Sequence, residues 1–151
     1  MNIIKALPED FDVVKSITAE TITSVYPKYY PKGAVEFFLS HHSDENIKND
    51  IASGIVYILI DEETAVGTVT INKNDIGRLF VLPEYQKKGY GKALIDFSEK
   101  IISAKYNEIC LSASLPAKQI YLKRGYKESE YNIILTDNGD YLCYDYMKKK
   151  V

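Results

Sequence analysis

A strand that runs directly into a glycine- and lysine-rich helix start is the feature that most constrains this chain. Residues 79–94 read LFVLPEYQKKGYGKAL. The apolar run from Leu79 to Leu82 is typical of a buried strand, and Pro83 marks its end. From Gly89 onwards apolar residues recur at helical spacing, which predicts a helix. Any fold of this chain therefore contains a strand, a loop and a helix in immediate succession here.

The start of that helix has the composition of an anion-binding site. The first turn of a helix presents N–H groups without intrahelical partners and roughly half a positive charge. Gly89 and Gly91 would let a bulky anion approach this backbone closely. These features predict a site for a pyrophosphate group. The alternative is that Lys87, Lys88 and Lys92 are simply the solvated start of a surface helix.

Two common phosphate-binding motifs do not fit this loop. A Walker loop would need a glycine in place of Gln86 and a metal-binding serine or threonine in place of Ala93. The dinucleotide-binding fingerprint would need its third glycine in place of Leu94. The sequence therefore predicts neither of these two nucleotide sites.

The rest of the chain alternates between helical and strand patterns. Apolar runs and turn signals predict strands over 2–7, 55–60, 65–71, 76–82, 108–113, 131–135 and 141–146. Helical spacing and capping residues predict helices over 8–27, 33–41, 43–53, 89–104 and 116–123. Asn138-Gly139 joins the last two strands as a hairpin, because this pair tolerates positive φ. The pattern predicts one α/β domain over residues 1–151, with a mixed central sheet of about seven strands flanked by helices.

Composition and charge narrow the function classes. The chain has 151 residues, 46% of them hydrophobic, which is enough for one domain with its own core. A balance of 19 Lys and Arg against 21 Asp and Glu, without a basic stripe, argues against nucleic-acid binding. The longest near-apolar run, 55–60, is far too short for a membrane helix, and the first residues lack a secretory signal pattern.

The number and placement of the cysteines favour a reducing compartment. Only two cysteines are present, Cys110 and Cys143, and both lie in apolar, strand-like runs. We interpret them as buried free thiols, because disulfides are rare in the cytosol. The expected setting is the reducing cytoplasm.

The loop motif resembles that of a known family. Gln-x-x-Gly-x-Gly after a Leu-Phe-Val-Leu-Pro strand is similar to the GNAT family of acyl-CoA-dependent N-acetyltransferases. Residues 114–126, SLPAKQIYLKRGY, resemble the family's second segment, Asn-x-x-Ala-x-x-x-Tyr-x-Lys-x-Gly-Phe. This chain departs from that segment at Ser114, where asparagine is usual, and at Tyr126, where phenylalanine is usual. The resemblance implies the single-domain GNAT fold.

The resemblance also implies a cofactor site. Acetyl-CoA would be the acyl donor, with its pantetheine arm along the backbone of the strand and its pyrophosphate at the loop, and no metal is expected. The residues that it assigns to cofactor binding are Phe80, Val81, Gln86, Lys87, Lys88, Gly89, Tyr90, Gly91, Lys92, Ser114, Ala117 and Lys123.

Two residues are candidates for the chemistry of acyl transfer. Tyr121 occupies the family's tyrosine position and would protonate the leaving thiolate, and a strand N–H near Val81 would polarise the thioester carbonyl. Asp75 stands where histone-acetyltransferase-like members carry a carboxylate, although it also reads as part of a plain turn. The alternatives for the general base are Glu36, the two histidines of the same helical region, and a chain of water molecules. His41 and His42 are expected at an exposed helix end rather than at a metal site.

The sequence says less about the molecule that accepts the acyl group. Tyr26, Tyr29 and Tyr30 stand where the resemblance implies the acceptor wall, or else form a corner that Pro27 and Pro31 make rigid. Nothing suggests a tray of acidic residues or a peptide groove, so a small primary amine is expected. The alternatives are a protein or peptide N-acetyltransferase and an acyl-CoA-binding sensor without turnover. Pairing of the terminal hairpins into a homodimer is a further expectation from the family.

Overall fold

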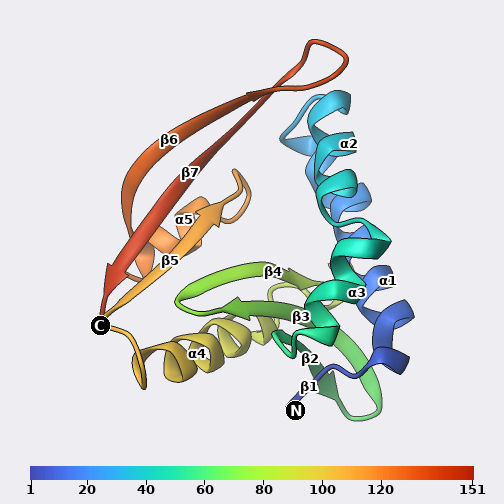
Figure 1. The fold of residues 1–151 in the computed structure, drawn as a ribbon. Helices are drawn as coiled ribbons and strands as arrows, with labels where there is room; N and C mark the ends of the chain where they lie inside the picture. The colour runs from blue at the N-terminus through green and yellow to red at the C-terminus, as the bar shows by residue number, and fades with distance from the viewer.

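A seven-stranded sheet forms the centre of the molecule (Figure 1). The computed structural model describes residues 1–151. In chain order the strands are β1 (Asn2–Lys5), β2 (Val56–Asp61), β3 (Thr64–Asn72), β4 (Asp75–Val81), β5 (Glu108–Ala113), β6 (Lys127–Leu135) and β7 (Tyr141–Lys150). Their order in the sheet is β1-β2-β3-β4-β5-β7-β6, and every pair is antiparallel except β4 with β5. The expected α/β fold with a mixed sheet of seven strands is confirmed.

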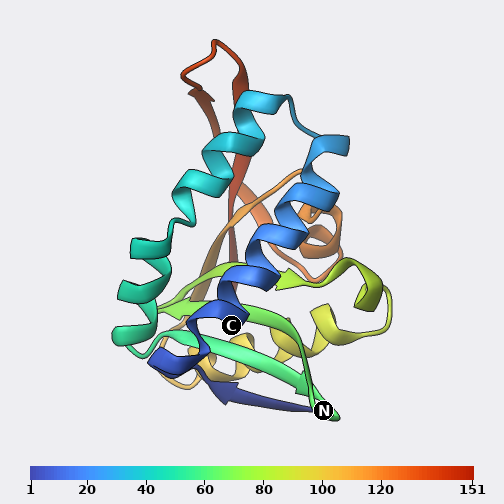
Figure 2. The same ribbon diagram turned by 90° about the vertical axis from the view of Figure 1, so that its right-hand side faces the viewer.

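Helices cover both faces of this sheet, as the two views show (Figure 2). They are α1 (Phe11–Val25), α2 (Lys32–His41), α3 (Asp44–Ala52), α4 (Tyr90–Ser103) and α5 (Lys118–Lys123). Three short 3-10 turns accompany them, η1 (Pro8–Asp10), η2 (Tyr26–Lys28) and η3 (Pro83–Tyr85). Helices α1 and α4 both contact strands β3 and β4. The centre of the sheet is therefore enclosed on two sides.

The core is divided between these two faces because the helices are amphipathic. On α4, Leu94, Ile95 and Ile102 recur at helical spacing and are buried in the largest apolar cluster, together with sheet residues such as Val69. The other face has its own cluster, in which Ile22 of α1 joins aromatic residues from η2 and β4. The strand that enters α4 is thus held from both sides.

Strands β4 and β5 separate soon after they begin. Only Asp75 and Ile76 of β4 are paired with β5, opposite Cys110 and Leu111. Beyond this point the two strands diverge, as Figure 1 shows. The backbone of β4 after Ile76 therefore has no partner on β5. Polar backbone groups need partners when they are buried, so such an edge is suited to binding a ligand.

Strand β4 is also irregular on its other side. Thr68 of β3 pairs with Phe80, but Thr70 pairs with Gly77, so the register shifts between them. Arg78 lies within this β-bulge and has a φ of 41°. A bulge bends a strand and redirects its side chains. Here it adds to the curvature of β4 at the place where β4 leaves β5.

The element boundaries differ from the sequence predictions mainly near the C-terminus. Strand β6 begins at Lys127 instead of 131, β7 continues to Lys150 instead of 146, and α5 begins at Lys118 instead of 116. Cys110 is buried, Cys143 is half-buried, and neither forms a disulfide. No helix combines the length and apolar character that spanning a membrane requires.

Candidate active site

Two cavities meet beside the diverging part of β4. We call the first the α4 cavity; it has a volume of about 630 Å³ and lies at the start of α4. We call the second the α2 cavity; it has a volume of about 300 Å³ and lies beneath α2. Six residues line both cavities: Tyr26, Leu79, Phe80, Ser114, Ala117 and Tyr121. A molecule in one cavity would therefore lie directly beside a molecule in the other.

The glycine-containing loop forms one end of the α4 cavity. Gln86, Lys87, Gly89, Gly91 and Lys92 all line it. The Gln86 side chain donates a hydrogen bond of 2.9 Å to the Val81 carbonyl, which fixes the loop to the end of β4. Gly89 has a φ of 93° and open space where a side chain would begin. The backbone at the start of α4 is therefore accessible to an anion.

Four basic residues line the α4 cavity, but two of them are already paired. Lys92 forms an ion pair of 2.7 Å with Asp96. Arg124 forms ion pairs with the same aspartate and with Glu99. Lys87 and Lys123 have no ion-pair partner in the protein. These two ammonium groups are available to neutralise phosphate charge in the cavity.

Two residues expected at the cofactor site lie outside this cavity. The ammonium of Lys88 lies over the Tyr85 ring, 5.2 Å from its centroid. The Tyr90 hydroxyl donates a hydrogen bond to Asp61, and its ring packs edge-on against Tyr85. The side chains of Lys88 and Tyr90 therefore contact other parts of the protein, and the expectation for this loop concerned its backbone N–H groups.

The residues of the α4 cavity fit a coenzyme A group. The cavity combines exposed helix-start amides, two unpaired lysines and the unpaired edge of β4. Val81 and Ala117 both line this cavity, and Ala117 also lines the second one. No group of three His, Cys, Asp or Glu side chains is placed to hold a metal ion.

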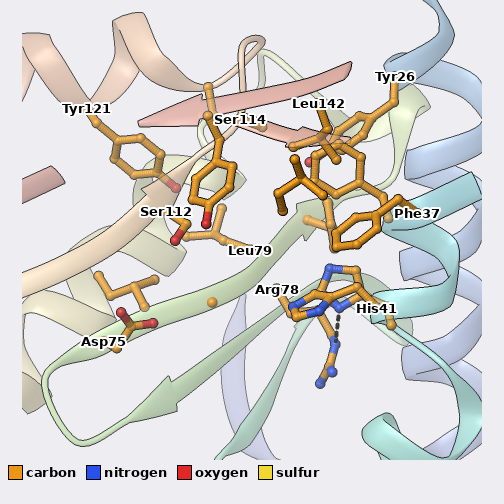
Figure 3. A pocket seen from close by; sticks show the side chains of 18 residues that line it. Tyr26, Phe37, His41, Asp75, Arg78, Leu79, Ser112, Ser114, Tyr121 and Leu142 are labelled. Carbon is orange, nitrogen blue, oxygen red and sulfur yellow. Dashed lines mark hydrogen bonds between the residues drawn. The ribbon is translucent and has the colours of Figure 1, made fainter. Parts of the chain in front are cut away.

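Asp75 is the unpaired carboxylate of the α2 cavity. It begins β4, and Figure 3 shows its carboxylate on the same side of the cavity as Ser112 and Tyr121. No hydrogen bond or ion pair within the protein engages it. Burial without a compensating partner raises the pKa of Asp75 to about 6. Near neutral pH such a group can accept a proton readily.

Tyr121 stands at the junction of the two cavities. It is buried on α5, and its ring packs edge-on against Tyr126 at 5.5 Å. Its hydroxyl points into the cavity in Figure 3 and has no hydrogen-bond partner in the protein. Burial raises the pKa of Tyr121 far above its usual range, so the phenol remains protonated. A protonated phenol and a carboxyl group of raised pKa therefore line the same cavity.

A buried polar cluster under α2 was not predicted. The Arg78 guanidinium donates to His42 Nδ1 at 3.2 Å and to the Thr70 hydroxyl at 3.2 Å, and it pairs with Asp50 at 2.8 Å. Burial and the neighbouring Arg78 charge lower the pKa of His42 to about 3. Since Nδ1 accepts a hydrogen bond, the neutral ring carries its proton on Nε2. The expectation of an exposed helix end is correct for His41 but wrong for His42.

The three tyrosines of the expected acceptor wall have different positions. Tyr26 lines both cavities, and Tyr29 is half-exposed at the α4 cavity. Tyr30 lines neither: it is buried against Phe38, and its hydroxyl accepts a hydrogen bond from the Leu115 N–H at 2.7 Å. For Tyr30 the rigid-corner interpretation describes the structure better than the acceptor wall does.

Most of the acceptor-side wall was missed by the sequence analysis. It comes from α2, β4, β5 and the terminal hairpin, and the residues concerned are Phe37, Phe38, Arg78, Ser112, Ile134, Leu142 and Tyr144. These residues are far apart in the chain and form no local motif. They come together through the pairing of β4, β5 and β7 in the sheet and the packing of α2 against β7.

Comparison with known proteins identifies the class to which this arrangement belongs. The model of the GNAT acetyltransferase domain family matches residues 25–139. A curated relative, the uncharacterised N-acetyltransferase YafP of Escherichia coli K12, is 24% identical over 120 residues, which are 80% of this chain and 77% of that protein.

Solved structures show the same fold. A GCN5-related N-acetyltransferase from Rhodopseudomonas palustris superimposes with a TM-score of 0.90 at 24% identity, over 99% of this chain and 95% of that one. The PaiA N-acetyltransferase from Thermoplasma acidophilum, solved in complex with coenzyme A, gives a TM-score of 0.75 at 24% identity, over 99% and 98% of the two chains. The family match over most of the chain identifies the class of protein as an acyltransferase. The chain belongs to the GNAT acetyltransferase family.

Proposed function

We propose that this protein transfers an acetyl group from acetyl-CoA directly to the primary amine of a small molecule. The observation that supports this most strongly is the junction of the two cavities, where Tyr121 lines both. One cavity has the groups that phosphates need, and the other contains an unpaired carboxylate of raised pKa. We place this reaction in the reducing cytoplasm, in keeping with the interpretation of the two cysteines.

The α4 cavity would bind the donor. The amides at the start of α4 would hold the pyrophosphate, with Lys87 and Lys123 as its charged partners. The backbone around Phe80 and Val81 would align the pantetheine arm as an added strand beside β4. Acetyl-CoA supplies the activated acyl group, and a backbone N–H of this strand would polarise its carbonyl.

Asp75 and Tyr121 would handle the protons. Asp75 accepts one proton from the ammonium of the acceptor and so produces a neutral amine. The amine nitrogen bonds to the carbonyl carbon while the carbon–sulfur bond breaks, and Tyr121 donates its phenolic proton to the leaving sulfur. The second amine proton restores the Tyr121 hydroxyl, and Asp75 releases its proton to solvent. The products are one amide, one free thiol and one proton.

The shape of the α2 cavity favours a small acceptor over a peptide. The Gly33 N–H of α2 donates to the Asp140 carboxylate at 2.8 Å, which joins α2 to the turn of the terminal hairpin. Figure 1 shows these two segments meeting above the sheet. A volume of about 300 Å³ is at the lower end for small-molecule sites. A peptide acetyltransferase would need a cleft that remains open at this end.

Donor binding is tested by thermal unfolding with acetyl-CoA, CoA, ATP and NAD in parallel. A ligand at about a hundred times its Kd adds roughly 2.7 kcal/mol, which is a rise of several degrees for a chain of this length. We expect acetyl-CoA and CoA alone to raise the Tm, and the rise to shrink in K87A and K123A. Equal shifts with all four ligands, or none, would contradict the proposed donor site.

Turnover separates an enzyme from a sensor. We expect thiol release from acetyl-CoA in the presence of primary amines, and we expect Y121F to lower the rate by about tenfold or more. The donor affinity of Y121F should be almost unchanged, because the ring and its packing against Tyr126 are kept. Donor binding without thiol release from any amine would favour the sensor.

A further inference from the structure

The α2 cavity has one unpaired carboxylate, that of Asp75, and no unpaired lysine or arginine. Besides Asp75, the charged or titratable side chains that line it are Arg78, the two histidines His41 and His42, and tyrosines. His42 is held neutral, and burial keeps the phenols of Tyr26 and Tyr121 protonated. The Asp75 carboxylate therefore favours a cationic group in the cavity and disfavours an anionic one.

Arg78 does not change this balance, although a guanidinium would normally bind a substrate carboxylate. All three of its nitrogens are engaged, by Asp50, His42 and Thr70. Its side chain is only 5% exposed, and the Asp50 carboxylate already balances its charge. An acceptor that carries a carboxylate would find no free cation among these groups and would lie near Asp75.

The opposite wall of the cavity is aromatic. Phe38 packs edge-on against Tyr26 at 4.6 Å, Phe37 stacks with His41 at 6.2 Å, and Leu142 closes the wall. Figure 3 shows Phe37, Tyr26 and Leu142 across the cavity from Asp75. Aromatic rings favour one another in stacked and edge-on arrangements, beyond the simple burial of apolar area. This wall is suited to a flat apolar group.

We propose that the acceptor is a small aromatic primary amine, with its ring on the aromatic wall, its ammonium towards Asp75, and no carboxylate. This inference rests on the proposed acetyl transfer and names the substrate class of the same site. An amine that a short linker joins to the ring would reach the side of the cavity on which Asp75, Ser112 and Tyr121 lie. A diamine would place its second ammonium at the aromatic wall, where this group would lose its hydration shell without gaining a carboxylate partner.

The test compares four amines in a thiol-release assay with acetyl-CoA. Phenethylamine has the proposed ring and linker, phenylalanine adds a carboxylate to it, butylamine lacks the ring, and putrescine adds a second charge. We expect kcat/KM for phenethylamine to exceed that of each of the others by about tenfold or more, the factor that about 1.4 kcal/mol of binding would give. Equal or better use of phenylalanine, butylamine or putrescine would overturn the aromatic-amine assignment while acetyl transfer itself stands. Absence of release with all four amines, when acetyl-CoA raises the Tm, would overturn both proposals.

A variant of the aromatic wall tests the same point independently. F37L keeps an apolar side chain and should fold, but it removes one ring from the wall. We expect F37L to raise KM for phenethylamine about threefold or more and to leave KM for butylamine and the acetyl-CoA melting shift unchanged. F11L is the matched control, because Phe11 lies outside both cavities, in a separate cluster. An equal effect of F37L on both amines would contradict a ring-binding wall.

Discussion

Replacing Asp75 by asparagine should stabilise the protein and inactivate it at the same time. Asparagine has almost the same shape as aspartate but no charge. Burial raises the pKa of Asp75 from 3.8 to about 6, with no partner to compensate. A residue kept for stability would show the opposite effect, because its loss would destabilise the fold. A gain in stability with a loss of rate is characteristic of a catalytic group held in an unfavourable environment.

The size and sign of the stability effect follow from the pKa shift. Each unit of pKa difference between the folded and unfolded states corresponds to about 1.4 kcal/mol, so the full shift amounts to roughly 3 kcal/mol. Because the carboxyl is partly exposed to solvent in the cavity, about 1 to 2 kcal/mol is the realistic gain for D75N. Below pH 3.8 both states of the wild type are protonated at this site, and no gain is expected. The gain grows as the pH rises towards about 6 and stays constant above it.

The catalytic effect is measured from the pH dependence of kcat/KM. In the wild type we expect the rate to fall as the pH drops through about 6, because the protonated carboxyl cannot accept a proton. In D75N this decrease at acidic pH should disappear, and the plateau rate should fall by about a hundredfold or more. Urea unfolding of the wild type and of D75N, near pH 5 and near pH 7.5, measures the change in stability. D12N is the matched control, because Asp12 is exposed. A D75N enzyme that keeps its rate within about threefold, or that keeps the acidic limb, would refute the assignment of Asp75 as the base.

Two further predictions concern the scaffold of the acceptor cavity. G33A should lower both the Tm and the acetyl-transfer rate, because a Cβ on Gly33 would lie 1.9 Å from the Asn138 side chain and 2.5 Å from the Thr136 hydroxyl, so that the hydrogen bond between these two side chains would break or α2 would shift. A Tm within a degree or so of the wild type would contradict this contact. D50N should destabilise the fold by about 2 kcal/mol in urea unfolding, because it leaves the buried Arg78 guanidinium without its counter-charge. D44N, which breaks an exposed ion pair, should change the stability much less, and equal losses for the two variants would count against a buried pair.

The terminal hairpin shows why some boundaries could not be predicted. Residues 127–130 read KESE, which has none of the apolar alternation by which a strand is recognised. They nevertheless form the start of β6, at the edge of the sheet, with their backbone paired to β7 and their side chains exposed. A strand in that position is held by its ladder of hydrogen bonds, which needs no apolar face.

The position of the glycine-containing loop was predictable because the features that define it are local. Gln86, Gly89 and Gly91 are neighbours in the chain, and the orientation of their backbone follows from the turn and from the start of α4. Five of the seven loop residues expected at the cofactor line the α4 cavity. Lys88 and Tyr90 do not, because a sequence motif gives positions along a loop but not the side towards which each side chain points.

The sequence by itself determined the elements, the α/β class and the glycine-containing loop before α4, because propensity, periodicity and glycine placement act over a few residues at a time. The tertiary structure decided the acceptor site. Asp75, Phe37 and Leu142 come from three elements, and they face one cavity only because β4 diverges from β5 and the hairpin meets α2. The raised pKa of Asp75 and the lowered pKa of His42 have the same origin. Burial depends on the whole fold, so no reading of neighbouring residues could have assigned either group its protonation state.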